Sequence, residues 1–184
     1  MFPRRGRVRR RSQPWMLIAT TLAMFVALMV LVFQDRNEES AAPAPTPVAT
    51  VLRYENTASL QRAEVVHVID GDTLDVRVDG EEQRLRYYGV DTPERGNDCY
   101  DEARKRNKAL AGDTVLLLPD ARDTDRYGRI LRYVFTEEGL SIDESLVAEG
   151  YGNAWREDGA YRDEIVDLEE KAESQGVGCL WEED

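Results

Sequence analysis

Hydrophobic and polar residues alternate along the middle of the chain. Leu74, Val76 and Val78 alternate with charged residues, and after Asp79-Gly80 the alternation resumes over residues 84–88. A period of two residues is typical of a strand with one buried face, and Asp-Gly is a strong hairpin-turn signal. The pattern predicts a β-hairpin, a strand that begins at Ala63, and two more strands over 115–118 and 130–135.

Three other stretches indicate helices. The first covers residues 100–111 and stops before Gly112, and the second opens with a capping box at Ser141 and ends at Gly150. The third has apolar residues at helical spacing, namely Tyr161, Ile165, Leu168 and Ala172. Five strands and three helices, with the first helix before the fourth strand, are compatible with an α+β fold built on a small OB-type barrel. Periodicity alone leaves other α+β topologies open.

The N-terminal region has a different organisation. Residues 15–33 are apolar or neutral throughout, close to the roughly 20 residues that cross a bilayer as a helix. Six arginines precede this segment, which predicts a cytoplasmic segment over 1–14 and an export orientation for the rest. A retained transmembrane anchor is the preferred interpretation, and a cleaved signal followed by secretion is the alternative. Residues 34–52 contain alternating Ala and Pro, which predicts an extended linker before a domain over 53–184.

The charge of the domain argues at first against a nucleic-acid ligand. Residues 51–184 carry 17 basic and 33 acidic side chains, a net charge of −16, and such a surface repels polyanions. Only Lys105, Lys108 and Lys171 are lysines. One explanation is adaptation to concentrated salt, where the Debye length falls to about 3 Å near 1 M and the repulsion is screened. The other is a GC-rich genome, which favours arginine codons; both explanations remain open.

Candidate chemistry is concentrated in three short motifs: IDGDT at 69–73, RYYGVDTPE at 86–94 and DRYGR at 125–129. Their carboxylates stand beside Gly or Pro, and carboxylate and carbonyl oxygens are the ligands that Ca²⁺ prefers. Arg86 and Arg129 supply planar guanidinium groups that match a phosphate. Carboxylates, a divalent cation and two arginines together indicate phosphoryl chemistry.

Each motif alone has a simpler interpretation. Asp-Gly pairs mostly turn the chain, and IDGDT lacks the Gly and Glu spacing of an EF-hand loop. The DTPE segment at 91–94 is typical of a helix N-terminus with Pro at the first position. Arg129 alone is typical of a charged residue on the protein surface. Only the combination of the three motifs, in this order, is specific.

Together the motifs VIDGDT, RxxxVDTPE and DxYGR resemble the staphylococcal nuclease family, and the resemblance covers about residues 63–181. It implies a five-stranded OB-type Greek-key barrel with three helices. It also implies calcium-dependent hydrolysis of DNA and RNA with little sequence preference, leaving 3′-phosphate and 5′-hydroxyl ends. The expected substrate is a single-stranded or frayed nucleic acid.

The resemblance implies a role for each matching residue. Asp72 and Asp91 would be the carboxylate ligands of Ca²⁺, the backbone carbonyl of Thr92 would be a third ligand, and Asp70 would lie beside them. Glu94 would act as general base or orient the attacking water. Arg86 and Arg129 would clamp the phosphate and stabilise the transition state.

The surroundings of this site depart from the family pattern. Tyr127 is similar to a tyrosine that lines the cleft, whereas the segment GYGNAWREDGAY at 150–161 replaces the family's tyrosine-containing substrate loop. Tyr151, Trp155 and Tyr161 are candidates for stacking on bases there. Most of the lysines of the family's basic face are absent, which puts affinity at low salt in question.

The remaining reactive side chains have structural interpretations. The only histidine, His67, lies within a strand pattern, so neither a zinc site of the common kinds nor a Ser-His-Asp triad is expected. Cys99 and Cys179 form an even pair in a domain predicted to be exported, which favours a disulfide over two free thiols.

Three functions compete: an enzyme, a non-catalytic binding module, and a tethered envelope-interaction protein whose acidic face binds cations structurally. The sequence favours an enzyme, a monomer outside the cytoplasm that is attached to the membrane by residues 15–33 and needs no obligate protein partner. A non-catalytic binding module on the same barrel is the rival. Degenerate modules of that kind lack some of the acids and arginines, whereas this chain keeps the full set: Asp72, Arg86, Asp91, Glu94 and Arg129.

Overall fold

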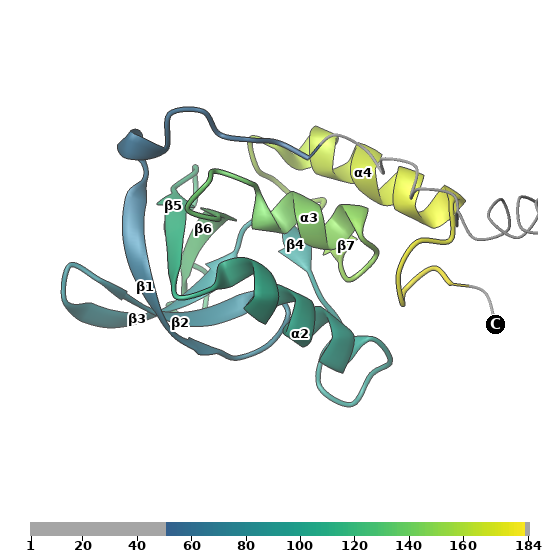
Figure 1. Ribbon diagram of the computed structural model, residues 1–184, viewed down its shortest axis with the longest axis horizontal. Helices are drawn as coiled ribbons and strands as arrows, with labels where there is room; N and C mark the ends of the chain where they lie inside the picture. Colours follow the sequence, from purple (N-terminus) through teal and green to yellow (C-terminus); the bar gives the residue numbers. More distant parts are fainter. Residues whose placement is uncertain (1–50, 183–184) are drawn as a thin grey trace, which may run out of the picture. The chain divides into compact units, whose positions relative to one another are not determined.

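Five strands close into a barrel in the computed structural model, which describes residues 51–182 (Figure 1). They are β1 (Gln61–Val68), β2 (Thr73–Val78), β3 (Glu81–Tyr87), β5 (Thr114–Leu118) and β6 (Ile130–Phe135). The barrel order is β1-β2-β3-β6-β5, and only the β3–β6 pair is parallel. The expected five-stranded OB-type barrel is confirmed.

Local sequence explains the hairpin between β2 and β3. The apolar residues of β2 are buried while Arg77 is exposed, as the alternation predicts. Asp79 and Gly80 both have positive φ, 51° and 88°, which a tight hairpin turn of the primed type requires. Val78 is therefore directly paired with Glu81, and the register continues to Thr73 and Arg86 at the far end. Both of those residues lie at the site described below.

Three helices cover the barrel: α2 (Tyr100–Ala111), α3 (Ile142–Ala148) and α4 (Arg162–Ser174). All seven residues of α3 are buried, because the helix packs between α4, α2 and β6. A short 3-10 helix, η1 (Thr57–Ser59), precedes β1. Two strands that the sequence did not indicate, β4 (Val90–Asp91) and β7 (Asn153–Ala154), pair with each other beside the barrel.

Two details of the sequence interpretation need correction. No helix begins at the DTPE segment, because residues 95–99 form turns and α2 starts only at Tyr100. The capping box is half formed: the Ser141 hydroxyl accepts the Glu144 N–H at 3.3 Å. The Glu144 carboxylate accepts the N–H of Leu52 instead, at 2.5 Å. Leu52, placed by the sequence at the end of the linker, thus contacts the start of α3.

The predicted anchor over 15–33 and most of the linker lie outside the described residues, so both stay predictions. Within residues 51–182, no helix has the combination of length and apolar character that crossing a bilayer requires.

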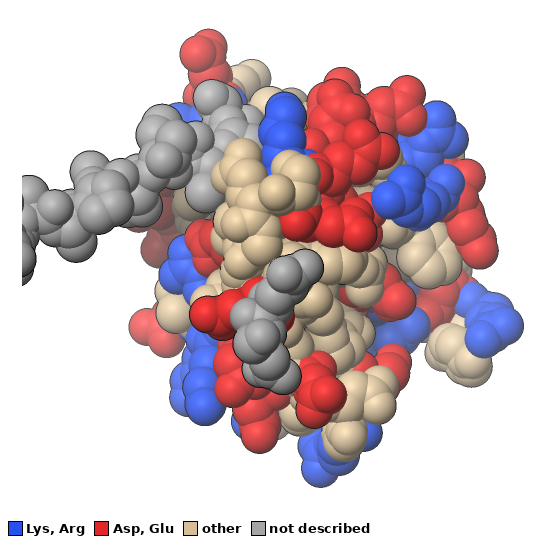
Figure 2. All heavy atoms as spheres, turned by 90° about the vertical axis from the view of Figure 1, so that its right-hand side faces the viewer, with Lys and Arg blue, Asp and Glu red and all other residues tan. Residues whose placement is uncertain are grey.

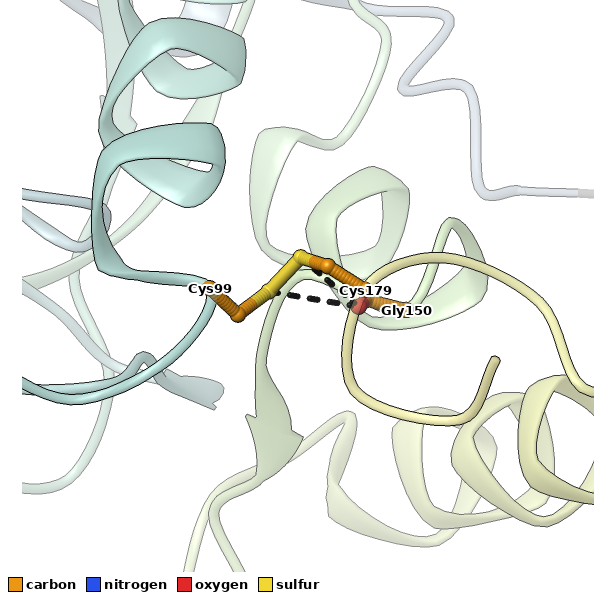
Figure 3. The surroundings of a disulfide bond; sticks show 3 residues. All are labelled: Cys99, Gly150 and Cys179. Carbon is orange, nitrogen blue, oxygen red and sulfur yellow. Dashed lines mark hydrogen bonds between the residues drawn. A yellow bond between two sulfur atoms is a disulfide. The ribbon is translucent and has the colours of Figure 1, made fainter. Parts of the chain in front are cut away.

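Cys99 and Cys179 form a disulfide, with 5.4 Å between their Cα atoms (Figure 3). The bond joins the residue before α2 to the segment after α4, and both sulfur atoms lie 3.9 Å from the carbonyl oxygen of Gly150. The expected disulfide is confirmed.

Acidic side chains prevail over basic ones on the face shown in Figure 2. Most arginines of the described part are held in ion pairs with carboxylates: Arg62, Arg77, Arg84, Arg86, Arg106, Arg122, Arg129, Arg132, Arg156 and Arg162. The positive charge of these arginines, which could attract a polyanion, is therefore largely neutralised by neighbouring carboxylates.

Asp143, in the first turn of α3, is fully buried without a cationic partner. Its two carboxylate oxygens accept the N–H groups of Gly89 and Val134 at 2.8 and 2.9 Å. Burial raises the pKa of Asp143 to about 7, because desolvation outweighs the stabilising hydrogen bonds.

The raised pKa of Asp143 predicts a pH-dependent stability. The unfolded carboxyl titrates near pH ~4, so the folded state binds more protons between there and pH ~7. The stability that neutral Asp143 contributes is fully present at acid pH and is lost as the pH rises through that window. In Asp143→Asn, the fall of the melting temperature between pH 5 and 8 should be clearly smaller than in the wild type, in thermal unfolding followed by circular dichroism. Parallel curves for the two proteins would contradict the assignment.

Candidate active site

The three motifs converge on one cleft of about 500 Å³ beside the barrel. Its lining contains the predicted site residues Asp70, Asp72, Arg86, Asp91, Glu94, Tyr127, Trp155 and Arg129. IDGDT reaches it from the start of β2, RYYGVDTPE from the end of β3 through β4, and DRYGR from the loop before β6. Residues far apart in sequence are therefore brought to one surface by the barrel topology.

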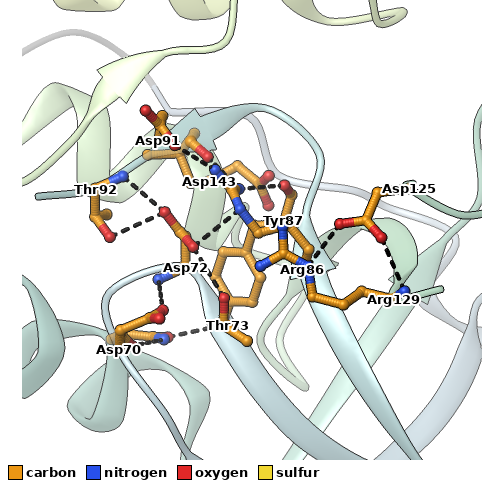
Figure 4. Close-up of polar contacts among 12 residues, drawn as sticks. Asp70, Asp72, Thr73, Arg86, Tyr87, Asp91, Thr92, Asp125, Arg129 and Asp143 are labelled. Carbon is orange, nitrogen blue, oxygen red and sulfur yellow. Dashed lines mark hydrogen bonds and ion pairs between the residues drawn. The ribbon is translucent and has the colours of Figure 1, made fainter. Parts of the chain in front are cut away.

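Asp72 is buried at the base of the cleft and holds the first two motifs together (Figure 4). One carboxylate oxygen accepts both the N–H and the hydroxyl of Thr92, at 2.7 and 2.9 Å. The other accepts the Thr73 hydroxyl at 3.1 Å. The neighbouring Gly71 has no room for a side chain, since a Cβ atom there would lie 2.5 Å from the Thr92 hydroxyl oxygen. The glycine of IDGDT is thus required by the close approach of Thr92.

Arg86 lies between the two predicted metal-binding carboxylates (Figure 4). Its Nε is 3.1 Å from Asp72, and one Nη donates to Asp91 at 2.6 Å. The other Nη donates to the carbonyl oxygens of Tyr87 and Val90, at 2.6 and 2.5 Å. Arg86 is only 8% exposed, but the cost of burying its positive charge is offset by the two carboxylates and the two carbonyl oxygens. Because a guanidinium carries five N–H groups, one N–H of the Nη that contacts Asp91 remains for a ligand.

The donor set around Asp72 and Asp91 suits a hard cation. Both carboxylates contact the same guanidinium, so they lie close to each other and offer only oxygen ligands, and the N–H of Thr92 ties that residue to Asp72. The Asp91 side chain is 58% exposed, and its second oxygen accepts no hydrogen bond from the described residues. No three His, Cys, Asp or Glu side chains between residues 51 and 182 form a metal-holding group, so the calcium ligands stay a prediction.

Asp70 adds negative charge next to this set. One of its carboxylate oxygens accepts the N–H of Asp72 at 3.1 Å. Burial, and then the charge of Asp72, raise the pKa of Asp70 above its ordinary value. Glu94 stands exposed on the rim, and its carboxylate has no hydrogen-bond partner among the described residues. It is therefore free to accept a proton.

The DRYGR loop is built to present Arg129. Asp125 accepts the N–H groups of Tyr127 and Arg129 at 2.8 and 2.9 Å, and the Nε of Arg129 at 2.6 Å. Burial alone would raise the pKa of Asp125, but the hydrogen bonds from Arg129 and Tyr127 outweigh it and lower the pKa. Gly128 completes the turn with a φ of 81°. The remaining N–H groups of Arg129 are left for a ligand in the cleft.

The aromatic candidates divide into two groups. Tyr127 is 69% exposed at the cleft, and the guanidinium groups of Arg126 and Arg129 lie 4.7 and 5.7 Å from its ring centre. Trp155 also lines the cleft. Tyr151 and Tyr161 do not; both pack against the hydrophobic core, so the structure does not bring them to the other site residues.

The sequence did not indicate a cluster around Asp158, whose partners Arg122, Tyr88 and Trp155 line the cleft. Asp158 accepts two hydrogen bonds from Arg122, at 2.5 and 2.7 Å, and further ones from Trp155 and Tyr88, each at 3.0 Å. The hydrogen bonds from Arg122 are the main cause that lowers the pKa of Asp158 to about 2. This cluster holds the loop that carries Trp155. Arg122 and Asp158 are 36 positions apart and follow no pattern that predicts their pairing.

Comparison with known proteins agrees with the geometry. The profile of the family described as Staphylococcal nuclease homologue matches residues 84–183. The chain is 38% identical over 131 residues to Protein ParB of Escherichia coli, covering 65% of this chain and 72% of that protein. It is 34% identical over 130 residues to Thermonuclease of Staphylococcus hyicus, covering 64% and 75%. It is 33% identical over 129 residues to Micrococcal nuclease of Shigella flexneri, covering 65% and 73%.

The family profile spans more than half of the chain and includes the second and third motifs. The relatives match over most of their own length, and the closed barrel with three helices is the fold that the resemblance implied. The chain belongs to the staphylococcal nuclease family.

Proposed function

We propose that this protein is a calcium-dependent nuclease that hydrolyses phosphodiester bonds of DNA or RNA, leaving 3′-phosphate and 5′-hydroxyl ends. The observation that carries the proposal is the meeting of Asp72, Arg86, Asp91, Glu94 and Arg129 at one cleft. The family relatives named as nucleases support it.

In the proposed mechanism, the side-chain groups that have no partner within the protein act on the substrate. Glu94, exposed and without a partner, accepts a proton from a water molecule that attacks phosphorus. The new P–O bond forms as the bond from phosphorus to the 5′ oxygen breaks, and that oxygen takes up a proton to become a hydroxyl. Arg129 and the remaining N–H of Arg86 donate hydrogen bonds to the non-bridging oxygens, whose negative charge they stabilise in the transition state.

Asp72, Asp91 and the Thr92 carbonyl would hold the calcium ion. When bound, the ion supplies positive charge that polarises the phosphate and offsets the repulsion between the substrate and the surrounding carboxylates. Asp72 accepts hydroxyl hydrogen bonds from Thr73 and Thr92. Because a hydroxyl group rotates readily, each carboxylate oxygen could exchange its hydroxyl contact for the ion while it keeps the N–H of Thr92 or the Nε of Arg86.

The rival proposal, a non-catalytic binding module, has less support. Binding alone would not require an exposed carboxylate without a partner at the rim, nor an arginine held by its own aspartate opposite a group of acids. The complete set of acids and arginines favours an enzyme.

The test is cleavage of single-stranded DNA and RNA by the full chain at low and at molar salt. We expect cutting with Ca²⁺ and background levels with EDTA, together with product ends that a phosphatase and a 5′ kinase identify as 3′-phosphate and 5′-hydroxyl. Undiminished cutting in EDTA would overturn the metal dependence. No cutting of either nucleic acid with any divalent cation would overturn the enzymatic proposal.

We also propose that the domain works outside the cytoplasm, anchored to the membrane by residues 15–33. The disulfide between Cys99 and Cys179 supports this, because such bonds persist in oxidising compartments. The test is to add protease to intact cells whose outer layers have been made permeable. If the domain is not cleaved, the proposed location is wrong.

A further inference from the structure

A second groove, of about 290 Å³, lies between β1 and α2, which contact each other. It is lined by Val65, Val66, His67, Val68, Arg104, Lys108, Gly112 and Asp113. None of these residues belongs to the cleft, and Asp113 is the one carboxylate in the lining.

The basic residues of α2 are unusual for this domain. Arg104, Lys105 and Lys108 lie within five positions of one another and have no carboxylate at ion-pair distance among residues 51–182. Arg104 and Lys108 are four positions apart, so they share one face of the helix, where like charges repel each other. Most of the arginines described are paired, as noted above. An acidic domain that keeps unpaired cations together points to an anionic ligand.

A bulge in β1 gives the groove an apolar centre. The register with β2 shifts between Val65 and His67, and both Val66 and His67 are exposed. Bulges often redirect side chains in this way. Val66 is 39% exposed, and it and Tyr127 are the two large exposed hydrophobic residues of the described part of the chain. Tyr127 lies at the cleft; Val66 lies among the cations of the groove.

Helix α2, which lines the groove, is hydrogen-bonded to a turn that lines the cleft. Arg104 donates to the carbonyl oxygen of Ile69 at 3.1 Å, and Asn107 donates to that of Asp70 at 2.9 Å. Helix α2 is thereby attached to the turn that carries Asp70 and Asp72 into the cleft.

The cleft needs such an additional contact. Its lining contains four arginines, Arg86, Arg122, Arg126 and Arg129, and six carboxylates, those of Asp70, Asp72, Asp91, Glu94, Asp125 and Glu157. Even with a divalent cation bound, the cleft has no net positive charge with which to attract a polyanion.

We propose that the groove between β1 and α2 is a second binding site for the phosphate backbone of a single strand whose scissile phosphate lies in the cleft. Lys108, in the lining of the groove, and Lys105, exposed on α2 three positions before it, contact phosphates, and Val66 contacts a sugar or base. The proposal rests on the function proposed above and adds the surface that supplies affinity for long substrates.

The test compares Lys105→Gln/Lys108→Gln with Lys171→Gln in the full chain. Lys171 is the chain's third lysine, lies on α4 and serves as the matched control. Arg104 is left intact because it supports the turn at Ile69. The substrates are single strands of about 20 nucleotides, enough to span both sites, and of about three nucleotides, which occupy the cleft alone.

The double variant should raise the ratio of KM for the long strand to KM for the short one roughly tenfold, while Lys171→Gln leaves that ratio at the wild-type value. The slope of log affinity for the long strand against log salt should become shallower by about 1.4, since each phosphate contact on a single strand contributes about 0.7. Thermal unfolding checks that the variants are folded.

Binding separates this proposal from the proposed nuclease activity. In a Glu94→Gln background, fluorescence anisotropy with a labelled strand of about 20 nucleotides measures affinity without cleavage. Weaker binding of the double lysine variant with a shallower salt slope supports the groove, even if no cleavage is ever seen. Binding and salt slope equal to those of Lys171→Gln overturn the groove, even if the protein is an active nuclease.

Discussion

Arg129→Ala is expected to lower kcat by roughly 10³-fold, the scale of losing one group that stabilises transition-state charge. Asp125 already fixes this arginine by its Nε and its backbone N–H, so the guanidinium needs no reorganisation when the substrate binds. Because the interaction strengthens as negative charge develops on the phosphate oxygens, the loss should appear in kcat more than in KM. Initial rates on a short single strand with saturating Ca²⁺ measure it.

Glu94→Gln should have an effect of similar size, for a different reason. The amide keeps the shape of the carboxylate but does not accept the proton of the attacking water. Glu94 is exposed and makes no side-chain hydrogen bond with the described part of the chain, so the fold should be unaffected. Glu157→Gln, at the same cleft, is the matched control for the loss of one negative charge, and its kcat should stay near the wild-type value.

Arg84→Ala is the matched control for Arg129→Ala. Arg84 is an exposed arginine paired with Asp75, and it lies outside the cleft. Its replacement should change kcat by no more than about twofold, since surface ion pairs contribute little. Wild-type kcat in either Arg129→Ala or Glu94→Gln would overturn the proposed roles.

Arg86 is unsuitable for the same experiment. Its guanidinium is buried and contacts Asp72, Asp91 and two backbone carbonyls. Removing it leaves Asp72 buried without its cation, which destabilises a protein by several kcal/mol in typical cases. A loss of activity in Arg86→Ala would therefore combine a lost phosphate contact with a damaged site.

Local pattern accounts for what the sequence predicted well. The alternation in β2, the Asp79-Gly80 turn and the bounds of α2 depend on neighbouring residues, so they are readable from short windows. The candidate site residues stand at strand ends next to Gly or Pro, and the barrel topology brings those ends together at one cleft.

Contacts between distant residues account for the rest. Strands β4 and β7 are two residues long, too short to show a period, and they form because Val90 and Ala154 meet in space. Trp155 and Tyr151 are both aromatic, so the same candidate role was predicted for both from the sequence. In the structure Asp158 holds the indole of Trp155 at the cleft, whereas Tyr151 packs on the core. Arg86 lies on the strand face opposite Leu85, as alternation predicts, yet it is buried because its contacts to Val90 and Asp91 cover it.

Loss of the disulfide should destabilise the protein by about 4.5 kcal/mol, the chain-entropy value for a closed loop of 80 residues. The bond joins the start of α2 to the segment after α4. In that segment the N–H of Leu180 donates to the carbonyl oxygen of Gly150 at 3.1 Å. Neither Gly150 nor Gly178 has room for a Cβ atom, because their backbones pack directly against each other.

The measurement is thermal unfolding of the wild type with and without reducing agent, beside Cys99→Ser/Cys179→Ser. The melting temperature of the reduced wild type and of the double variant should fall by an amount on the order of 15 °C, given the usual entropy of unfolding for a domain of this size. The cross-link lies away from the cleft, so kcat at a temperature where both proteins are folded should stay near the wild-type value. Reducing agent should have no effect on the double variant. An unchanged melting temperature in the fully reduced wild type would show that packing around Gly150 holds the C-terminal segment without the bond.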